Sequence, residues 1–251
     1  MKKLSTHLHK FPMLTLLILL ILGSGCKKEG EQVPGHELST GASARELVSG
    51  KFFKKLELEI LHHPNSEPSA STISRVQEFL QNHIDKPEGI NISLRALPTA
   101  QQSDYSINSL LALEAAHRTK FNEKGVMSLC LLLVDGDFSE TNQVLGVAYR
   151  NTTMALFHRT IRRHSGGLGQ PQRSILETTV ILHELGHVFG LVNNGAAMQQ
   201  AHQDVAHGKH CNDNDCLMFY AVETTDFLGN LLGGQIPALD AQCLDDLNAL
   251  K

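Results

Sequence analysis

The string HELGHVFG, which begins at His183, constrains this chain more than any other part of the sequence. A helix turns once in about 3.6 residues, so His183 and His187 lie on the same face of a helix. Their imidazoles can therefore bind one metal ion, and Glu184 can reach a water molecule on that ion. Gly190 allows the helix to end and the chain to turn sharply. We predict that residues 172–190 form a helix at the centre of a metal site.

Two histidines and a glutamate in the pattern H-E-x-x-H are typical of zinc peptidases, in which the glutamate acts as the general base. The same pattern occurs by chance in ordinary helices, where the histidines lie on the surface. A catalytic zinc needs three protein ligands and an open coordination position. The zinc interpretation therefore depends on whether the rest of the sequence supplies a third ligand.

The N-terminus predicts a segment for export. Three lysines accompany an apolar run over residues 11–22, which is shorter than the roughly 20 residues of a membrane-spanning helix. Small residues then lead to Cys26, and this pattern resembles a bacterial lipoprotein signal. We predict that residues 1–25 are a signal peptide and that Cys26 carries the lipid, which anchors the protein in the cell envelope, at the outer membrane or cell surface. An ordinary secretory signal and an uncleaved anchor are the alternatives.

The remaining sequence divides into a tether and one domain. Residues 26–50 are rich in Gly, Ser, Glu and Lys, with little periodicity, and predict a flexible tether. Residues 51–251 are enough for one domain with a sizeable core. Within it, residues 51–192 would form an N-terminal subdomain and residues 193–251 a smaller C-terminal one. The formal net charge of −4, without a basic stripe, argues against a nucleic acid as partner.

Hydrophobic periodicity predicts an α+β fold, with a mixed β-sheet, the active-site helix and a smaller irregular C-terminal subdomain that ends in a helix. Period-2 alternation or apolar runs predict strands at residues 55–61, 90–97, 126–134, 143–149 and 153–161. Apolar residues at helical spacing predict helices at residues 70–84, 106–119 and 236–250. The run at 126–134 is apolar throughout, which indicates a central strand. His158 and His164 are expected to be solvated.

The string that begins at His210 carries a resemblance to a known family. Residues 210–218 read HCNDNDCLM, which is H-C-x-x-x-x-C-x-M. Joined to the H-E-x-x-H-x-x-G of the helix, it resembles the archaemetzincins, a family of metzincin zinc peptidases with the signature H-E-x-x-H-x-x-G-x-x-H-C-x-x-x-x-C-x-M. The segment between Gly190 and His210 is longer than in the family, so we interpret it as an insertion.

The resemblance implies a metzincin-like (zincin) fold with one catalytic Zn²⁺ and a peptide or protein as substrate. It implies His183, His187 and His210 as the metal ligands and Glu184 as the general base. In this reaction the zinc lowers the pKa of a water molecule, and the glutamate takes the proton as the water attacks the peptide carbonyl.

Two further residues take roles from the resemblance. Met218 corresponds to the methionine-turn residue, whose thioether packs beneath the imidazoles. Tyr220 lies two residues later, where some metzincins place a tyrosine that stabilises the oxyanion, and it is a candidate catalytic residue. The alternative for Tyr220 is a packed aromatic side chain after the turn.

Four other residues compete with His210 for the third ligand position. Asn193 occupies the position of the family's third histidine, but its amide is a weak zinc ligand. His202, Asp204 and His207 lie within the insertion. We favour His210 because the two cysteines and the methionine after it fix the register of the motif. His202 and His207 are then expected to be exposed loop residues.

The cysteines that follow Cys26 are Cys130, Cys211, Cys216 and Cys243. Archaemetzincins carry a later C-x-x-C that helps to bind a second, structural zinc, whereas only Cys243 follows here. A four-cysteine site would need Cys130, which lies in the predicted central strand. We therefore expect no second zinc, a buried Cys130 thiol and, outside the cytoplasm, a Cys211–Cys216 disulfide.

The predicted function is zinc-dependent hydrolysis of peptide bonds by a lipid-anchored enzyme. One alternative is a non-catalytic zinc-binding surface lipoprotein, which collects metal with the histidine-rich insertion. The presence of Glu184 argues against it, since a pure binder needs no base at that position. Another alternative is a degenerate peptidase that only binds partners, and Asn193 is the best support for it. The oligomeric state is not predicted.

Overall fold

The computed structural model describes residues 32–98 and 102–251 of the chain. The predicted signal peptide and Cys26 lie outside these residues. Among the described helices, none combines the length and the apolar character that crossing a membrane requires.

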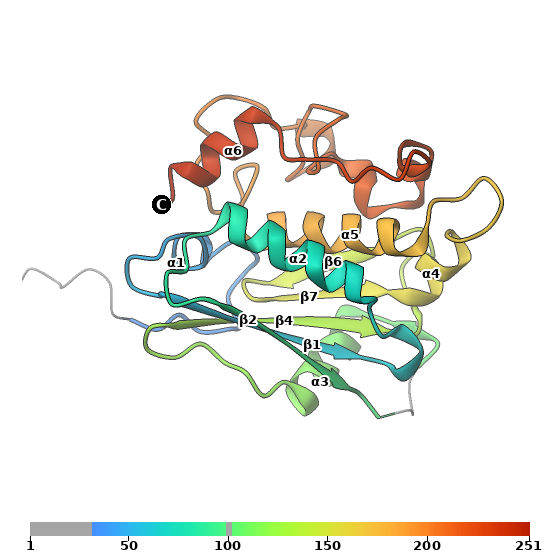
Figure 1. The fold of residues 1–251 in the computed structure, drawn as a ribbon, viewed down its shortest axis with the longest axis horizontal. Helices are drawn as coiled ribbons and strands as arrows, with labels where there is room; N and C mark the ends of the chain where they lie inside the picture. The colour runs from blue at the N-terminus through green and yellow to red at the C-terminus, as the bar shows by residue number, and fades with distance from the viewer. Residues whose placement is uncertain (1–31, 99–101) are drawn as a thin grey trace, which may run out of the picture. The chain divides into compact units, whose positions relative to one another are not determined.

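A five-stranded sheet forms the centre of the fold, in the order β2-β1-β4-β7-β6 (Figure 1). Its members are β1 (Lys55–His62), β2 (Ile90–Ala96), β4 (Val126–Val134), β6 (Gly146–Arg150) and β7 (Thr153–Phe157). The first four strands of this order are parallel to their neighbours, and β6 runs antiparallel to β7. β2 and β6 are therefore the edges of the sheet. A separate pair joins β3 (Asp104–Tyr105) and β5 (Asp137–Phe138).

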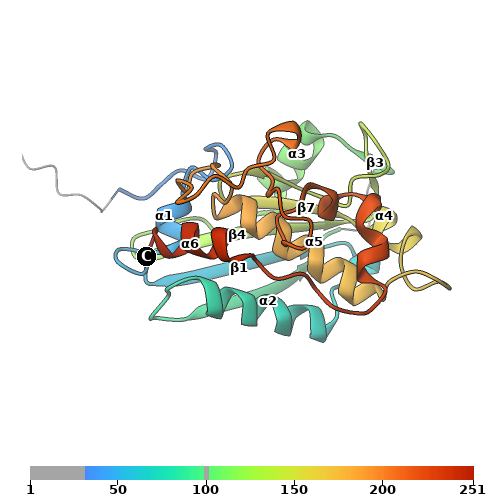
Figure 2. The same ribbon diagram turned by 90° about the horizontal axis from the view of Figure 1, so that it is seen from above.

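Helices cover both faces of this sheet (Figures 1 and 2). α2 (Ala70–His83) and α5 (Arg173–Val188) lie on one face and α3 (Ile107–His117) lies on the other. The C-terminal segment, which ends in α6 (Ala241–Asn248), lies over α5 on the side away from the sheet. Shorter helices are α1 (Ala44–Val48), α4 (His158–Arg163), η1 (Pro64–Ser66), η2 (Val205–His207), η3 (Tyr220–Glu223) and η4 (Thr225–Leu231). Because α5 is covered on several sides, every residue from Ile175 to Val188 is buried.

Two hydrophobic cores, one on each face of the sheet, explain why β4 is apolar along its length. Alternate side chains of a strand point to opposite faces of the sheet. Leu131 belongs to the core shared with α2 and α5, whereas Cys130 and Leu132 belong to the core shared with α3. β4 is therefore the predicted central strand. The Cys130 thiol is buried as expected, and burial raises its pKa.

The predicted flexible tether over residues 26–50 is wrong in its second half. α1 forms there, and its Leu47 and Val48 are fully buried in the core next to α5. The side-chain amide of Asn151 donates a hydrogen bond of 2.7 Å to the Ser43 hydroxyl. Three apolar residues in a five-residue helix carry no periodicity, so the sequence pattern could not indicate this burial.

The predicted strand over residues 153–161 is also too long. β7 ends at Phe157, and the chain continues as α4. β-branched residues such as Thr160 and Ile161 favour strands, but tertiary packing overrides that preference here. His158 is consequently buried rather than solvated, and its Nε2 lies 3.3 Å from the Glu177 carboxylate.

Candidate active site

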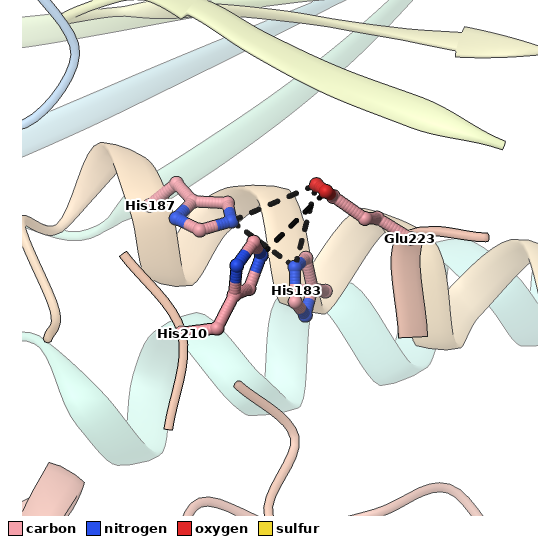
Figure 3. Close-up of side chains that lie close together, drawn as sticks. All are labelled: His183, His187, His210 and Glu223. Atoms are coloured by element: carbon pink, nitrogen blue, oxygen red, sulfur yellow. Dashed lines mark hydrogen bonds and ion pairs between the residues drawn. The ribbon is translucent and has the colours of Figure 1, made fainter. Parts of the chain in front are cut away.

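Four side chains meet at α5 (Figure 3). His183 and His187 belong to this helix, and His210 and Glu223 lie against them. The ligand atoms of these residues all lie within 4.8 Å of one another. The Nε2 atoms of His183 and His187, one helical turn apart, are separated by 3.1 Å. His210 and Glu223 come from the C-terminal segment that covers the helix. The structure therefore brings together the three predicted histidines and adds a carboxylate that the sequence analysis did not single out.

Backbone carbonyls fix the orientation of two of these rings. The Nδ1 of His183 lies 2.7 Å from the Leu217 carbonyl oxygen, and the Nδ1 of His210 lies 2.6 Å from the His207 carbonyl oxygen. A carbonyl can only accept, so each Nδ1 carries the proton, and a neutral ring then has an unprotonated Nε2. The Nε2 of His210 is buried and has no hydrogen-bond partner among the described residues. Lone pairs that converge in this way, beside a carboxylate, fit a metal cation.

The electrostatics favour the protonation states that a metal requires at His187 and Glu223. At His210 burial lowers the pKa, but the Glu223 carboxylate outweighs burial and the net shift is upward. Burial lowers the pKa of His187 well below its ordinary value, and His183 and His210 lower it further. Burial raises the pKa of Glu223, but its interactions with His183 and His210 outweigh burial, and the net shift is downward. Neutral imidazoles and an ionised carboxylate are the forms that bind metals.

Glu184 lies next to the cluster, between α5 and the edge strand β6. An added Cβ at Gly146 in β6 would lie 2.9 Å from the Glu184 Oε1 and 2.6 Å from the Val180 side chain, so the glycine leaves the space that the glutamate occupies. Glu184 is fully buried, and neither carboxylate oxygen has a hydrogen-bond partner of good geometry among the described residues. Burial raises its pKa well above the ordinary value, and the Glu223 carboxylate raises it further. Such a carboxylate is suited to accept and return a proton.

Two glycines of the HELGHVFG string allow close contacts around the helix. An added Cβ at Gly186 would overlap the Met218 sulfur, so the buried Met218 packs against the helix between the two histidines. Gly190 has a φ of +79°, and an added Cβ there would lie 2.7 Å from both the Ala44 Cβ and the Ala196 backbone nitrogen. The chain turns sharply at Gly190, as the sequence predicts, because only glycine fits this conformation and spacing.

The rival ligands of the inserted segment lie in other surroundings. The His207 side chain is 43 % exposed, and its Nδ1 lies 2.6 Å from the Asp204 carboxylate. Its ring stacks on Tyr220 with a centroid distance of 3.6 Å. Asn193 lies in the turn after α5, with a φ of +57°. His202 belongs to a separate cluster. Tyr220, the candidate catalytic residue, therefore packs against His207. Glu223, which follows Met218 by five residues, lies near the three histidines instead.

The separate cluster gathers His202, Cys211, Asp240 and Cys243, whose ligand atoms all lie within 4.8 Å of one another. Cys216 lies next to Cys243, and the histidine and the three cysteines are buried. The Nδ1 of His202 lies 3.4 Å from the Cys211 sulfur and 3.8 Å from the Cys243 sulfur. The sulfurs of Cys216 and Cys243 are 3.7 Å apart. The predicted Cys211–Cys216 disulfide is not formed, since both cysteines are free. The Cys211 thiol instead contacts His202 and donates to the Asp240 carboxylate at 3.0 Å.

Neighbouring groups orient this cluster as they would in a metal site. The Nε2 of His202 lies 2.9 Å from the fully buried Asp246 carboxylate, so Nε2 carries the proton and Nδ1 faces the thiols. The backbone N–H groups of Met218 and Asp240 donate to the Cys216 sulfur at 3.4 and 3.5 Å. Interactions with the other two thiols lower the pKa of Cys216 to about 4, which favours a thiolate. The three cysteines therefore lie near His202 and Asp240, whereas Cys130 lies in the core shared with α3.

No protein-family model matches the chain, and no match is found among curated proteins. Among solved structures, an archaemetzincin from Methanopyrus kandleri is 18 % identical, with 78 % of this chain and 96 % of that chain covered and a TM-score of 0.52. A metalloproteinase-II from Bacteroides fragilis is 14 % identical, with 89 % and 58 % covered and a TM-score of 0.47. The likeness to the archaemetzincin shows that this chain has an archaemetzincin-like zincin fold, and the predicted fold class is confirmed.

Proposed function

We propose that this chain is a zinc-dependent peptidase, with His183, His187 and His210 as the zinc ligands and Glu184 as the general base. The observation that carries the proposal is the convergence of three imidazole Nε2 atoms beside a buried carboxylate of raised pKa. The archaemetzincin-like fold supports it, because the same helix holds the first two histidines and the base in the H-E-x-x-H pattern.

Each group has a defined part in the proposed reaction. Zinc, when bound, lowers the pKa of a water molecule toward neutrality and polarises the carbonyl of the substrate. Glu184 takes a proton from the attacking water at a carboxylate oxygen and then delivers it to the leaving amine. The burial that raises the pKa of Glu184 strengthens its affinity for this proton between the two transfers.

The edge strand β6 offers a place for the substrate. An extended peptide can add to the exposed edge of a sheet through main-chain hydrogen bonds. The Thr40 hydroxyl already donates to the Ala148 carbonyl oxygen at 3.1 Å. Thr40 therefore occupies the edge of β6 at Ala148. We place the peptide at the other end of the strand, near Gly146, because this residue lies next to Glu184.

Metal removal tests the proposed activity. We expect the zinc-loaded protein to cleave members of a peptide library, detected as new termini by mass spectrometry. Treatment with 1,10-phenanthroline should abolish cleavage, and zinc added after removal of the chelator should restore it. A protein that holds several weakly bound zinc ions and cleaves no peptide would instead support the metal-collecting alternative.

We also propose a second, structural zinc ion in the cluster of His202, Cys211, Cys216 and Cys243. Cys243→Ser should lower the zinc content by one ion per chain and lower the melting temperature by roughly 5 °C or more, since losing even about 2 kcal/mol has this effect. Cys130→Ser is the matched control, because Cys130 is a buried thiol outside the cluster. Its zinc content should stay at the wild-type value. Thiol titration that finds a disulfide among the cluster's cysteines would contradict the proposal.

The membrane location remains a proposal as well. The sequence pattern before Cys26 supports a lipid anchor in a bacterial cell envelope. Cys26→Ser should move the protein from the membrane fraction to the soluble fraction and abolish incorporation of labelled palmitate. Palmitate incorporation that persists in this variant would contradict the assignment of Cys26.

A further inference from the structure

The Glu223 carboxylate faces all three histidines of the candidate active site (Figure 3). Its Oε2 lies 3.7 Å from the His183 Nε2 and 3.8 Å from the His187 Nε2. Its Oε1 lies 3.6 Å from the His210 Nε2. One carboxylate oxygen lies near His183 and His187 and the other lies near His210, so the carboxylate is shared by the three histidines rather than paired with one of them.

The carboxylate lies close to where the fourth ligand of a tetrahedral zinc site would lie. With Zn–N and Zn–O distances of about 2.0–2.2 Å, two ligand atoms of a tetrahedral site are about 3.4 Å apart. The Glu223 distances of 3.6–3.8 Å are only slightly longer. Catalytic zinc sites keep this fourth position open for water and substrate, whereas sites with four protein ligands are closed.

The main chain holds Glu223 in this place. Glu223 is the last residue of η3, and its carbonyl oxygen accepts a hydrogen bond of 2.8 Å from the Leu145 N–H, just before β6. The Thr225 N–H donates to the Gln143 carbonyl at 3.1 Å. The side chain is 28 % exposed, so it reaches into the cluster from the surface of the protein. Rotation of the side chain toward solvent can remove the carboxylate without breaking these backbone contacts.

We propose that Glu223 is a fourth ligand that closes the metal site at rest and that a substrate or inhibitor must displace. The charges agree with this role. Imidazole ligands are neutral, so the Glu223 carboxylate, in addition to that of Glu184, would stabilise the dication electrostatically. The proposal rests on the zinc site proposed above. It adds that the fourth position is occupied by the chain itself, so the resting site is latent until Glu223 moves away.

Zinc affinity and acetohydroxamate affinity together test this role. We would compare the wild-type protein with Glu223→Gln and with Glu140→Gln, which makes the same change at an exposed glutamate. Zinc affinity is measured by competition with a chromogenic chelator, and hydroxamate affinity is measured on the zinc-loaded proteins by calorimetry. Visible absorption of the cobalt-substituted proteins reports the coordination geometry without any assay of turnover.

The proposal predicts opposite changes in the two affinities. Glu223→Gln should bind zinc at least about tenfold more weakly, because it loses a charged group at the metal. It should bind hydroxamate more tightly, by about tenfold if one wild-type molecule in ten is open at rest. Its cobalt spectrum should change, and Glu140→Gln should match the wild type in all three measurements. Glu223→Asp, which keeps the charge but withdraws it by one methylene, should behave like Glu223→Gln.

Two results would overturn the proposal and leave the zinc site intact. In the first, Glu223→Gln has wild-type affinity for zinc and for hydroxamate. In the second, both affinities fall together, which would give Glu223 a purely structural role. A wild-type protein that takes up no zinc at the histidines would overturn the proposed peptidase function as well, and it is recognised before any variant is made.

Discussion

Replacing Glu184 with glutamine is expected to lower peptide turnover by about 100- to 10 000-fold, the range that general acid–base catalysis contributes. The amide keeps the shape of the side chain but cannot accept the proton from the attacking water. Glu184 is not one of the groups that converge on the proposed ion, so the zinc content should stay at the wild-type value. Turnover and zinc content are measured on the same preparation.

Glu177→Gln provides the matched control for this experiment. Glu177 lies on the same helix and is 3 % exposed, but its neighbour is His158 rather than the histidine cluster. We expect its turnover to remain near the wild-type value. Full turnover in Glu184→Gln would exclude Glu184 as the base, whereas equal loss in both variants would point to damage of the helix.

Replacing His210 with alanine is expected to remove one zinc ion, whereas replacing His207 with alanine should remove none. Removing a residue that only supports the ligands weakens metal binding by roughly 10- to 100-fold. Removing a ligand itself should weaken zinc binding by more than this. His207 is the natural control, since it lies three residues before His210, at the end of the inserted segment, and its side chain pairs with Asp204. Its backbone carbonyl, which orients His210, is unchanged by the substitution.

Zinc content by mass spectrometry, after dialysis against a weak chelator, distinguishes the two variants. With the second ion in place, wild type and His207→Ala should hold two zinc ions per chain and His210→Ala one. Loss of zinc in His207→Ala alone would move the third ligand into the insertion and contradict the archaemetzincin-like assignment.

Local patterns predicted the parts of this fold that depend on neighbours in sequence. The H-E-x-x-H helix, the alternating β1 and the apolar β4 each carry their own signal, and all three are present. The register of the H-C-x-x-x-x-C-x-M string pointed to His210 across a long insertion. Such signals survive because a ligand pair one turn apart and a strand of period 2 are set by backbone geometry alone.

The sequence patterns did not predict the contacts that depend on the path of the chain between distant residues. Glu223 follows Met218 by five residues and belongs to no motif. The contacts of η3 with α5 and with the segment before β6 bring it to the histidines. His202 looked like an exposed loop residue, because its buried partner Asp246 lies 44 positions away in the sequence. The disulfide prediction failed for the same reason, since spacing alone cannot show that His202 and Cys243 lie next to Cys211.

Zinc-edge anomalous diffraction from crystals of the zinc-loaded protein tests the central claim most directly. The account predicts a strong peak about 2.0–2.1 Å from the Nε2 atoms of His183, His187 and His210, the usual zinc–nitrogen distance. A crystal with full zinc loading and no peak at these three nitrogens, or with a peak held by His207 and Asp204, would contradict it.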